Sequence, residues 1–379
     1  MIKRVLLNGI LLLLVSNLLL QGVGAQDEYQ SWITRAAELL REKKFNEALD
    51  AYGQALKIKP DAYKTWYGKG VVLDGLGRYK EAVEAFDKAT EIQPNFFDAW
   101  LNKGLSLVRV EEDHDKAVTE AIKAYDKAIE IRPNAYEAWL NKGNALTRIR
   151  KYNEAIEAYN KAIEIDPKHH AAYTDKGLLL GDTGRNEEAI ETLNKAIEIK
   201  PDSYFAWSNK GLAFMRLQRY GEAVEAFDKA AYYKPDAYDA FTNKGLALSR
   251  LKRYDEAISA YDKALQIAPT SYESWYNKAF VYVEQKKYEQ AVEAFDKVNQ
   301  IRYDYIKGWT SKGDVLLAMG KTEEARKAFE EAIKLRPDTP EAMVGKGSAF
   351  VRLGRYDEAV KSFNDAIALT PNSYEAWIG

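Results

Sequence analysis

Residues 133–148 read PNAYEAWLNKGNALTR, and residues 235–250 read PDAYDAFTNKGLALSR. Both stretches begin with proline, carry the same Asn-Lys-Gly step and end on arginine. The prolines extend this similarity along the chain, because nine of the ten are spaced by 34 residues, apart from one gap of 39 and one of 68. They are Pro60, Pro94, Pro133, Pro167, Pro201, Pro235, Pro269, Pro337 and Pro371. This period predicts an array of similar units rather than the two or three globular domains that 379 residues would otherwise suggest.

The other signals align when Tyr29 is counted as position 1 of a 34-residue unit. All eight tryptophans then fall at position 4, position 8 is glycine or alanine, position 20 is alanine, and position 24 is mostly aromatic. The pattern predicts two helices per unit, over roughly positions 2–14 and 18–31. Small residues at positions 8 and 20 would let the two backbones approach closely. Proline at position 32 would end the second helix.

Together these positions resemble the tetratricopeptide-repeat (TPR) family, in the type common in archaea and bacteria. The resemblance covers residues 29–379 and implies an all-α fold, a TPR α-solenoid in which antiparallel helix pairs stack into a right-handed superhelix. Ten units are expected, followed by the start of an incomplete eleventh at 374–379. Their ranges are 29–62, 63–96, 97–135, 136–169, 170–203, 204–237, 238–271, 272–305, 306–339 and 340–373.

Three units depart from the pattern. The third has five extra residues around positions 110–120, which predict an added turn at the start of its second helix, near Asp113. The eighth has Tyr303 in place of its proline and Val298 at a position that is otherwise alanine, so its second helix is expected to run on or to bend differently. The eleventh stops after six residues, which indicates a fragment or a truncated gene product.

The first 25 residues differ from the rest. Lys3 and Arg4 precede an apolar run over residues 5–20, and small residues at Val23 and Ala25 precede Gln26. This order predicts a secretory signal peptide, and therefore a protein exported to the cell envelope or the outside of the cell. An uncleaved membrane anchor is the alternative, although the apolar run is short for a membrane span.

Composition and motifs argue against several classes of function. A net charge of −2 provides no basic field for nucleic acid. The absence of cysteine excludes disulfides, thiolate zinc sites and cysteine nucleophiles. The adjacent His169 and His170 lack further ligands for a metal, and no catalytic or cofactor-binding motif occurs. The sequence therefore predicts a protein that is not an enzyme and that has no metal or cofactor.

The resemblance implies that positions 2, 5, 6, 9, 12 and 13 of each first helix line a concave groove. Position 6 is Asn102, Asn141, Asp175, Asn209, Asn243 and Asn277 in units three to eight. This column is similar to the asparagines in the TPR region of O-linked N-acetylglucosamine transferase. A carboxamide can donate to a peptide C=O and accept from an N–H at once, so the column predicts capture of an extended peptide without demanding a sequence. Alternatively, these side chains tie neighbouring repeats together or are merely solvated.

Two further columns carry charge. Position 13 holds Arg109, Arg148, Arg216 and Arg250, which either bind carboxylates of a partner or complement the negative helix C-terminus. Position 7 holds lysine in nine units, and we interpret this row as structural because lysine stems can cover apolar surface.

The leading hypothesis from the sequence is a protein- or peptide-binding scaffold that mediates protein–protein interaction. One alternative is the substrate-recruiting arm of a larger, glycosyltransferase-like enzyme whose catalytic part is missing. Another is a structural array that self-assembles, with oligomers forming through the uncapped C-terminal helix.

Overall fold

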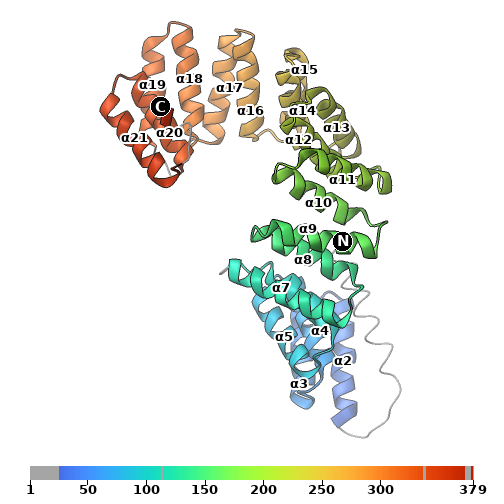
Figure 1. The fold of residues 1–379 in the computed structure, drawn as a ribbon. Coiled ribbons are helices and arrows are strands. Elements are labelled where there is room, and N and C mark those ends of the chain that lie inside the picture. The colour runs from blue at the N-terminus through green and yellow to red at the C-terminus, as the bar shows by residue number, and fades with distance from the viewer. Residues whose placement is uncertain (1–24, 112–113, 336–338, 372–376, 379) are drawn as a thin grey trace. The chain divides into compact units, whose positions relative to one another are not determined.

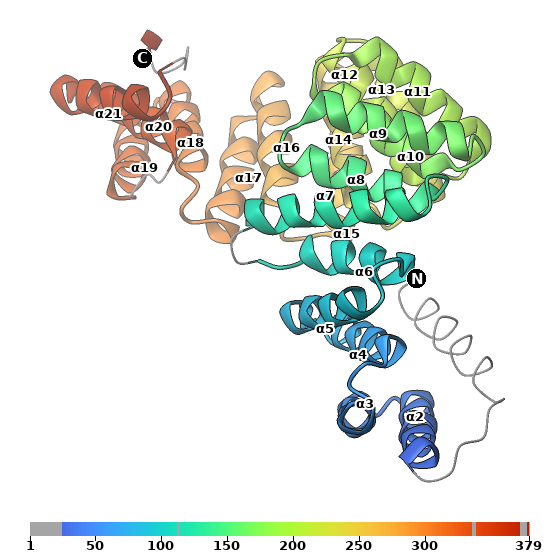
Figure 2. The same cartoon turned by 60° about the horizontal axis from the view of Figure 1, so that its bottom comes forward.

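The computed structural model describes residues 25–111, 114–335, 339–371 and 377–378 (Figures 1 and 2). Within these ranges the regular structure is entirely helical, and the chain divides into two compact units, residues 1–184 and 185–379. The predicted signal peptide lies outside the described residues, as does most of the segment 374–379. Among the helices that are described, none combines the length and the apolar character needed to cross a membrane.

The N-terminal unit consists of first helices and second helices in alternation. They are α2 Ala25–Arg41, α3 Phe45–Ile58, α4 Tyr63–Gly75, α5 Tyr79–Ile92, α6 Phe97–Leu107, α7 His114–Ile131, α8 Tyr136–Arg148, α9 Tyr152–Ile165 and α10 His170–Asp182. The second helix α7 has 18 residues where α5 and α9 have 14, so the longer third repeat does carry an added turn at the start of its second helix.

The C-terminal unit continues the alternation from a second helix, α11. Its helices are α11 Asn186–Ile199, α12 Tyr204–Arg216, α13 Tyr220–Tyr233, α14 Tyr238–Arg250, α15 Tyr254–Ile267, α16 Tyr272–Glu284, α17 Tyr288–Ile301, α18 Ile306–Ala318, α19 Thr322–Lys334, α20 Pro340–Arg352 and α21 Tyr356–Leu369. Consecutive helices of this unit pack against each other in antiparallel pairs (Figure 1).

The pairs are held close by an aromatic ring that lies on a glycine. At Gly211 of α12, an added Cβ atom would lie 2.6 Å from the ring of Phe227 of α13, and at Gly245 of α14 it would lie 2.7 Å from the ring of Tyr261 of α15. Both rings are fully buried. Position 8 is therefore small because the ring at position 24 occupies the space that a side chain would need.

The turn between the two helices of a repeat uses a left-handed residue at position 15. Gly77, Gly184, Gly320 and Gly354 have φ between 70° and 83°, as expected of a residue that ends a helix in this conformation. The same conformation occurs without glycine, at φ of 56–61°, in Lys43, Arg150, Gln218, Lys252 and Lys286. Helix packing thus imposes the turn even where the residue carries a Cβ atom, at a cost of about 1–2 kcal/mol per residue.

Tryptophan at position 4 has a hydrogen-bonding role that its spacing alone does not reveal. Its indole Nε1–H donates to the backbone C=O of position 32 in the preceding repeat, at 2.8–3.1 Å. In the repeat that lacks proline, Trp309 donates in the same way to the C=O of Tyr303, at 2.9 Å. The second helix α17 ends at Ile301, at the position where the others end, so the expectation that it runs on is wrong. The tryptophan and the helix cap hold this terminus without proline.

The lysine row at position 7 connects neighbouring repeats. In five repeats the ammonium group pairs at 2.5–2.6 Å with an aspartate on the preceding second helix, as Lys278 does with Asp262. In four of these repeats the ammonium group also lies over the position-4 tryptophan ring, and Lys278 is 5.3 Å from the centre of the Trp275 ring. Only 8% of Lys278 is exposed. These contacts support the interpretation of the row as structural.

Candidate functional site

Each first helix carries one stripe of residues that share a face, at positions 2, 6, 9 and 13. With 3.6 residues per turn, these positions fall within about 60° of one another around the helix axis. On α14 the stripe is Asp239, Asn243, Leu246 and Arg250. Because α14 contacts both α12 and α16, three stripes lie next to one another in the C-terminal unit. In the N-terminal unit, α4 contacts α6, and α8 contacts α10.

The first asparagine of the column ties two repeats together. The Asn102 Nδ2–H donates to the hydroxyl of Tyr67 at 2.9 Å and to the backbone C=O of Asp98 at 2.9 Å. Burial raises the pKa of Tyr67, so the hydroxyl stays protonated and the contact persists across the physiological range. Asn102 thus connects neighbouring repeats, as the alternative interpretation of the column expects.

Asp175 also belongs to an internal network. Asn144, at position 9 of the preceding first helix, hydrogen-bonds the Asp175 carboxyl. The Oδ1 atom of Asn144 accepts in turn from the hydroxyl of Tyr159, at 2.6 Å, and that hydroxyl lies 3.2 Å from Thr147 Oγ1. Burial raises the pKa of Asp175 above its ordinary value, and the bond from Asn144 offsets part of this effect.

Asp175→Asn should therefore stabilise the protein at pH 7 more than at pH 4. A carboxyl whose pKa is higher in the folded state binds more protons there, so it lowers stability as the pH rises from about 4, its value in an unfolded chain, through the folded pKa. The variant removes this loss and retains a side chain of the same shape. The measurement is the thermal midpoint of the wild-type protein and of the variant at pH 4 and at pH 7. The same difference between the two proteins at both pH values would contradict a raised pKa of Asp175 in the folded state.

The other four asparagines are not tied. Asn141, Asn209, Asn243 and Asn277 are half-buried, and their side chains form no hydrogen bond with any residue in the described part of the chain. In both units, the residue at position 5 of the preceding first helix decides whether the amide or hydroxyl group at position 6 is hydrogen-bonded. Tyrosine there reaches position 6 of the next repeat, since Tyr67 bonds Asn102 and the Tyr276 hydroxyl lies 3.4 Å from Ser311 Oγ.

Shorter or apolar side chains at position 5 leave the following asparagine available. Leu101 precedes Asn141, and Ser208 precedes Asn243. Thr242 precedes Asn277, but its hydroxyl bonds Ser274 Oγ at 2.7 Å and the C=O of Tyr238 at 2.9 Å. In the sequence, a tyrosine 35 residues before Asn102 indicates that this asparagine is hydrogen-bonded to the preceding repeat. The four asparagines without a partner among the described residues have no tyrosine at the corresponding position.

Two arginines of the column contact the preceding repeat. Arg109 pairs with Asp74 of the preceding first helix at 2.7 Å, and Arg148 donates to the C=O of Val108, the C-cap of α6, at 2.8 Å. Arg148 thus meets a helix C-terminus, although that of a neighbouring helix. Arg216 and Arg250 are exposed at the ends of their stripes.

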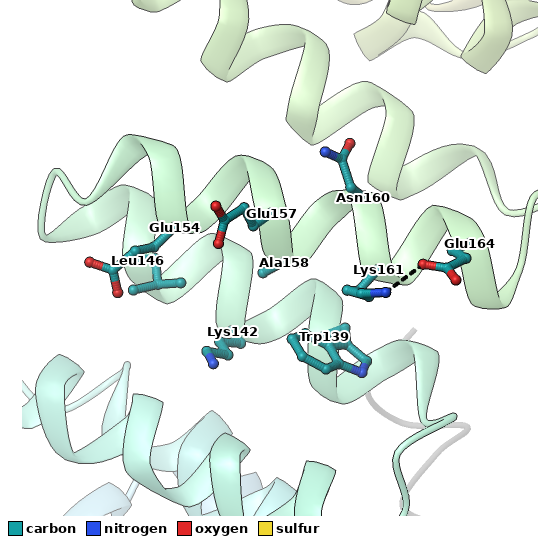
Figure 3. Close-up of a pocket in the computed structure, with 9 residues that line it drawn as sticks. All are labelled: Trp139, Lys142, Leu146, Glu154, Glu157, Ala158, Asn160, Lys161 and Glu164. Carbon is teal, nitrogen blue, oxygen red and sulfur yellow. Dashed lines mark hydrogen bonds and ion pairs between the residues drawn. The ribbon is translucent and has the colours of Figure 1, made fainter.

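A hollow in the N-terminal unit lies on another face. A shallow pocket of about 500 Å³ lies between α8 and α9, with Trp139, Lys142 and Leu146 of α8 on one side and Glu157 and Lys161 of α9 on the other (Figure 3). These α8 residues point roughly opposite to Asn141 around the helix axis. The pocket and the stripe of α8 are therefore separate surfaces.

Neither surface contains a grouping of metal ligands. In residues 25–111, 114–335, 339–371 and 377–378 there is no cluster of three or more histidine or carboxylate side chains suited to a metal ion. His169 is exposed, and its ring lies 4.2 Å from the ring of Tyr136.

Family models described as tetratricopeptide repeat match most of the chain. The matched residues are 29–62, 63–96, 136–169, 174–232, 208–272, 248–311 and 310–374. The chain belongs to the tetratricopeptide-repeat family. The all-α array of paired helices is thus a TPR solenoid, and the prediction of fold class is confirmed.

Solved TPR structures show the same fold. Yeast Tom70 is 16% identical, with a TM-score of 0.54, and the alignment covers 94% of each chain. A tetratricopeptide repeat protein from Parabacteroides merdae is 17% identical, with a TM-score of 0.51, over 65% of this chain and 95% of that chain. At these identities the likeness concerns the fold alone. No curated protein matches the sequence.

Proposed function

We propose that this TPR protein is a scaffold that holds extended segments of other polypeptides on the stripes of its first helices. The observation that carries the proposal is the set of four half-buried asparagines without a partner in the described structure. These amides reach solvent, so a peptide backbone that binds there can take the place of water as their hydrogen-bond partner. Because an amide both donates and accepts, it pairs with either peptide group of any sequence.

The same proposal extends to location. The basic start, apolar run and small residues of segment 1–25 favour export, so we propose that the scaffold acts in the cell envelope or outside the cell. Sequencing the N-terminus of protein purified from its own organism tests this. A mature chain that begins at Gln26 is expected, and an intact Met1 would favour a membrane anchor instead.

The test of binding replaces Asn141, Asn209, Asn243 and Asn277 together by alanine. We expect at least about a tenfold loss in affinity for partners captured from the organism's envelope fraction, because each lost amide bond contributes about 0.5–1.5 kcal/mol. The helical content should remain unchanged by circular dichroism, since these side chains support no other residue that the structure describes.

Two single variants serve as controls for this experiment. Asn160→Ala alters an exposed side chain of α9 that lies at the pocket, away from the stripes, and should leave capture unchanged (Figure 3). Asn102→Ala removes the bond to Tyr67 and should lower stability rather than affinity. If the variant with all four asparagines replaced is folded and still captures partners as the wild-type protein does, the stripes of the first helices are not the binding face.

A further inference from the structure

An apolar row runs beside the available asparagines of the C-terminal unit. On α12, α14 and α16, position 6 is asparagine, and position 9 is Leu212, Leu246 and Phe280. The two leucines are half-buried and Phe280 is 41% exposed. Each of these three neighbouring helices thus offers one amide and one apolar side chain on the same stripe.

The spacing of the row suits one peptide conformation. Helices in contact lie about 8–10 Å apart, and α14 contacts both α12 and α16, so we expect the apolar side chains to recur at about that interval. A polyproline II helix has three residues per turn and rises about 3.1 Å per residue, so every third side chain returns to the same face after about 9.3 Å. A β-strand alternates its side chains with a period of two and would turn the third residue away.

The backbone chemistry agrees with this conformation. Polyproline II has no internal hydrogen bonds, so its C=O groups, and the N–H groups of residues other than proline, are free. Asn209, Asn243 and Asn277 supply donors and acceptors at the same interval as the apolar row.

Charges define the two sides of the row. Asp239 and Glu273 are exposed at position 2, at the N-terminal ends of α14 and α16, and Asp239 also accepts a hydrogen bond from the Tyr204 hydroxyl. Arg250 is exposed at position 13, at the C-terminal end of α14. In a polyproline II segment, the two residues between successive apolar ones point toward opposite sides. A basic residue on the acidic side and an acidic residue on the arginine side would complement these charges.

We propose that α12, α14 and α16 bind a polyproline II segment with an apolar residue at every third position, and with its basic and acidic residues directed to opposite sides. This inference rests on the proposed peptide-binding function and adds the conformation and register of the partner. The apolar side chains at position 9 set the register of the bound peptide, and the asparagines at position 6 hydrogen-bond its backbone. The charged side chains at positions 2 and 13 select the charges of its other residues.

The test compares two fluorescein-labelled twelve-residue peptides for binding to the full chain by fluorescence anisotropy. One contains four repeats of Leu-Pro-Gln, and the other has the same composition with its leucines at alternate positions. We expect about tenfold or tighter binding of the first peptide, since each seated leucine removes apolar surface from water. Leu246→Asn should abolish this preference, whereas Leu251→Asn, at an exposed residue just beyond the stripe of α14, should preserve it.

A second comparison addresses charge. Replacing the four glutamines of the first peptide by lysine and, separately, by glutamate should change affinity in opposite directions, and Arg250→Glu should shift the preference toward lysine. Equal effects of both charges would overturn the charge assignment.

Two further outcomes would show whether only the inferred peptide register is wrong or whether the proposed peptide binding is wrong as well. If both leucine arrangements bind equally and Asn243→Ala weakens both, the register inference is wrong although peptide binding stands. If neither peptide binds and no member of a random dodecapeptide library binds either, the proposed function fails as well.

Discussion

Replacing Phe227 with alanine should lower the free energy of unfolding of the C-terminal unit by about 3–5 kcal/mol. The ring is 0% exposed and lies against Gly211, where an added Cβ atom would stand only 2.6 Å away. The space left by the ring would therefore become a cavity between α12 and α13. Since neighbouring repeats stabilise one another across their interfaces, the loss should extend to α14.

Urea unfolding followed by circular dichroism measures the total effect of Phe227→Ala, and hydrogen exchange shows where it acts. Exchange is needed because a repeat array can open locally before the whole chain unfolds. Tyr232→Ala is the matched control, because this ring lies on the same helix and is 74% exposed. It should change stability by no more than about 0.5 kcal/mol. Similar effects of the two variants would contradict the role given to the buried ring.

Asn299→Leu should raise the stability of the C-terminal unit by about 1–3 kcal/mol. Asn299 is only 4% exposed, and neither its Oδ1 nor its Nδ2 atom has a hydrogen-bond partner among the described residues. Most other repeats carry leucine or isoleucine at this position of the second helix. Leucine has nearly the shape of asparagine and removes the cost of burying two unpaired polar atoms.

The neighbouring residue shows why the site accepts this change. A Cβ atom on Gly308 would lie 2.3 Å from Asn299 Oδ1, so glycine at this point leaves room for the side chain between α17 and α18. The thermal midpoint of the variant measures the gain, with Asn160→Leu, at an exposed site, as the control expected to give none. An unchanged or lower midpoint for Asn299→Leu would mean that the polar atoms are satisfied in solution.

The sequence predicted the repeat and the helix pairs well because these depend on local signals. Small residues at positions 8 and 20 and the glycines of the turns are visible in a single unit. The second helix of the eighth repeat was expected to run on because proline was treated as its terminator. The structure shows that the bond from Trp309 to the C=O of Tyr303 and the cap of α17 hold that end, so the proline is dispensable.

The candidate site could be predicted only in part, because the state of each polar side chain depends on the repeat before it. The column at position 6 is plain in the sequence, yet Asn102 is bound by Tyr67 from 35 residues upstream, while Asn243 follows the shorter Ser208 and makes no such bond. Arg109 and Arg148 likewise bond groups of the preceding repeat, the Asp74 carboxylate and the Val108 C=O.

The sequence by itself determined the period, the helix pairs and the residue types on each face, because helical periodicity and turn preferences act within a few residues. Only the tertiary structure decided which groups on those faces are already paired. Hydrogen bonds between repeats depend on the reach of side chains across a helix interface, and a period of 34 residues does not show that reach.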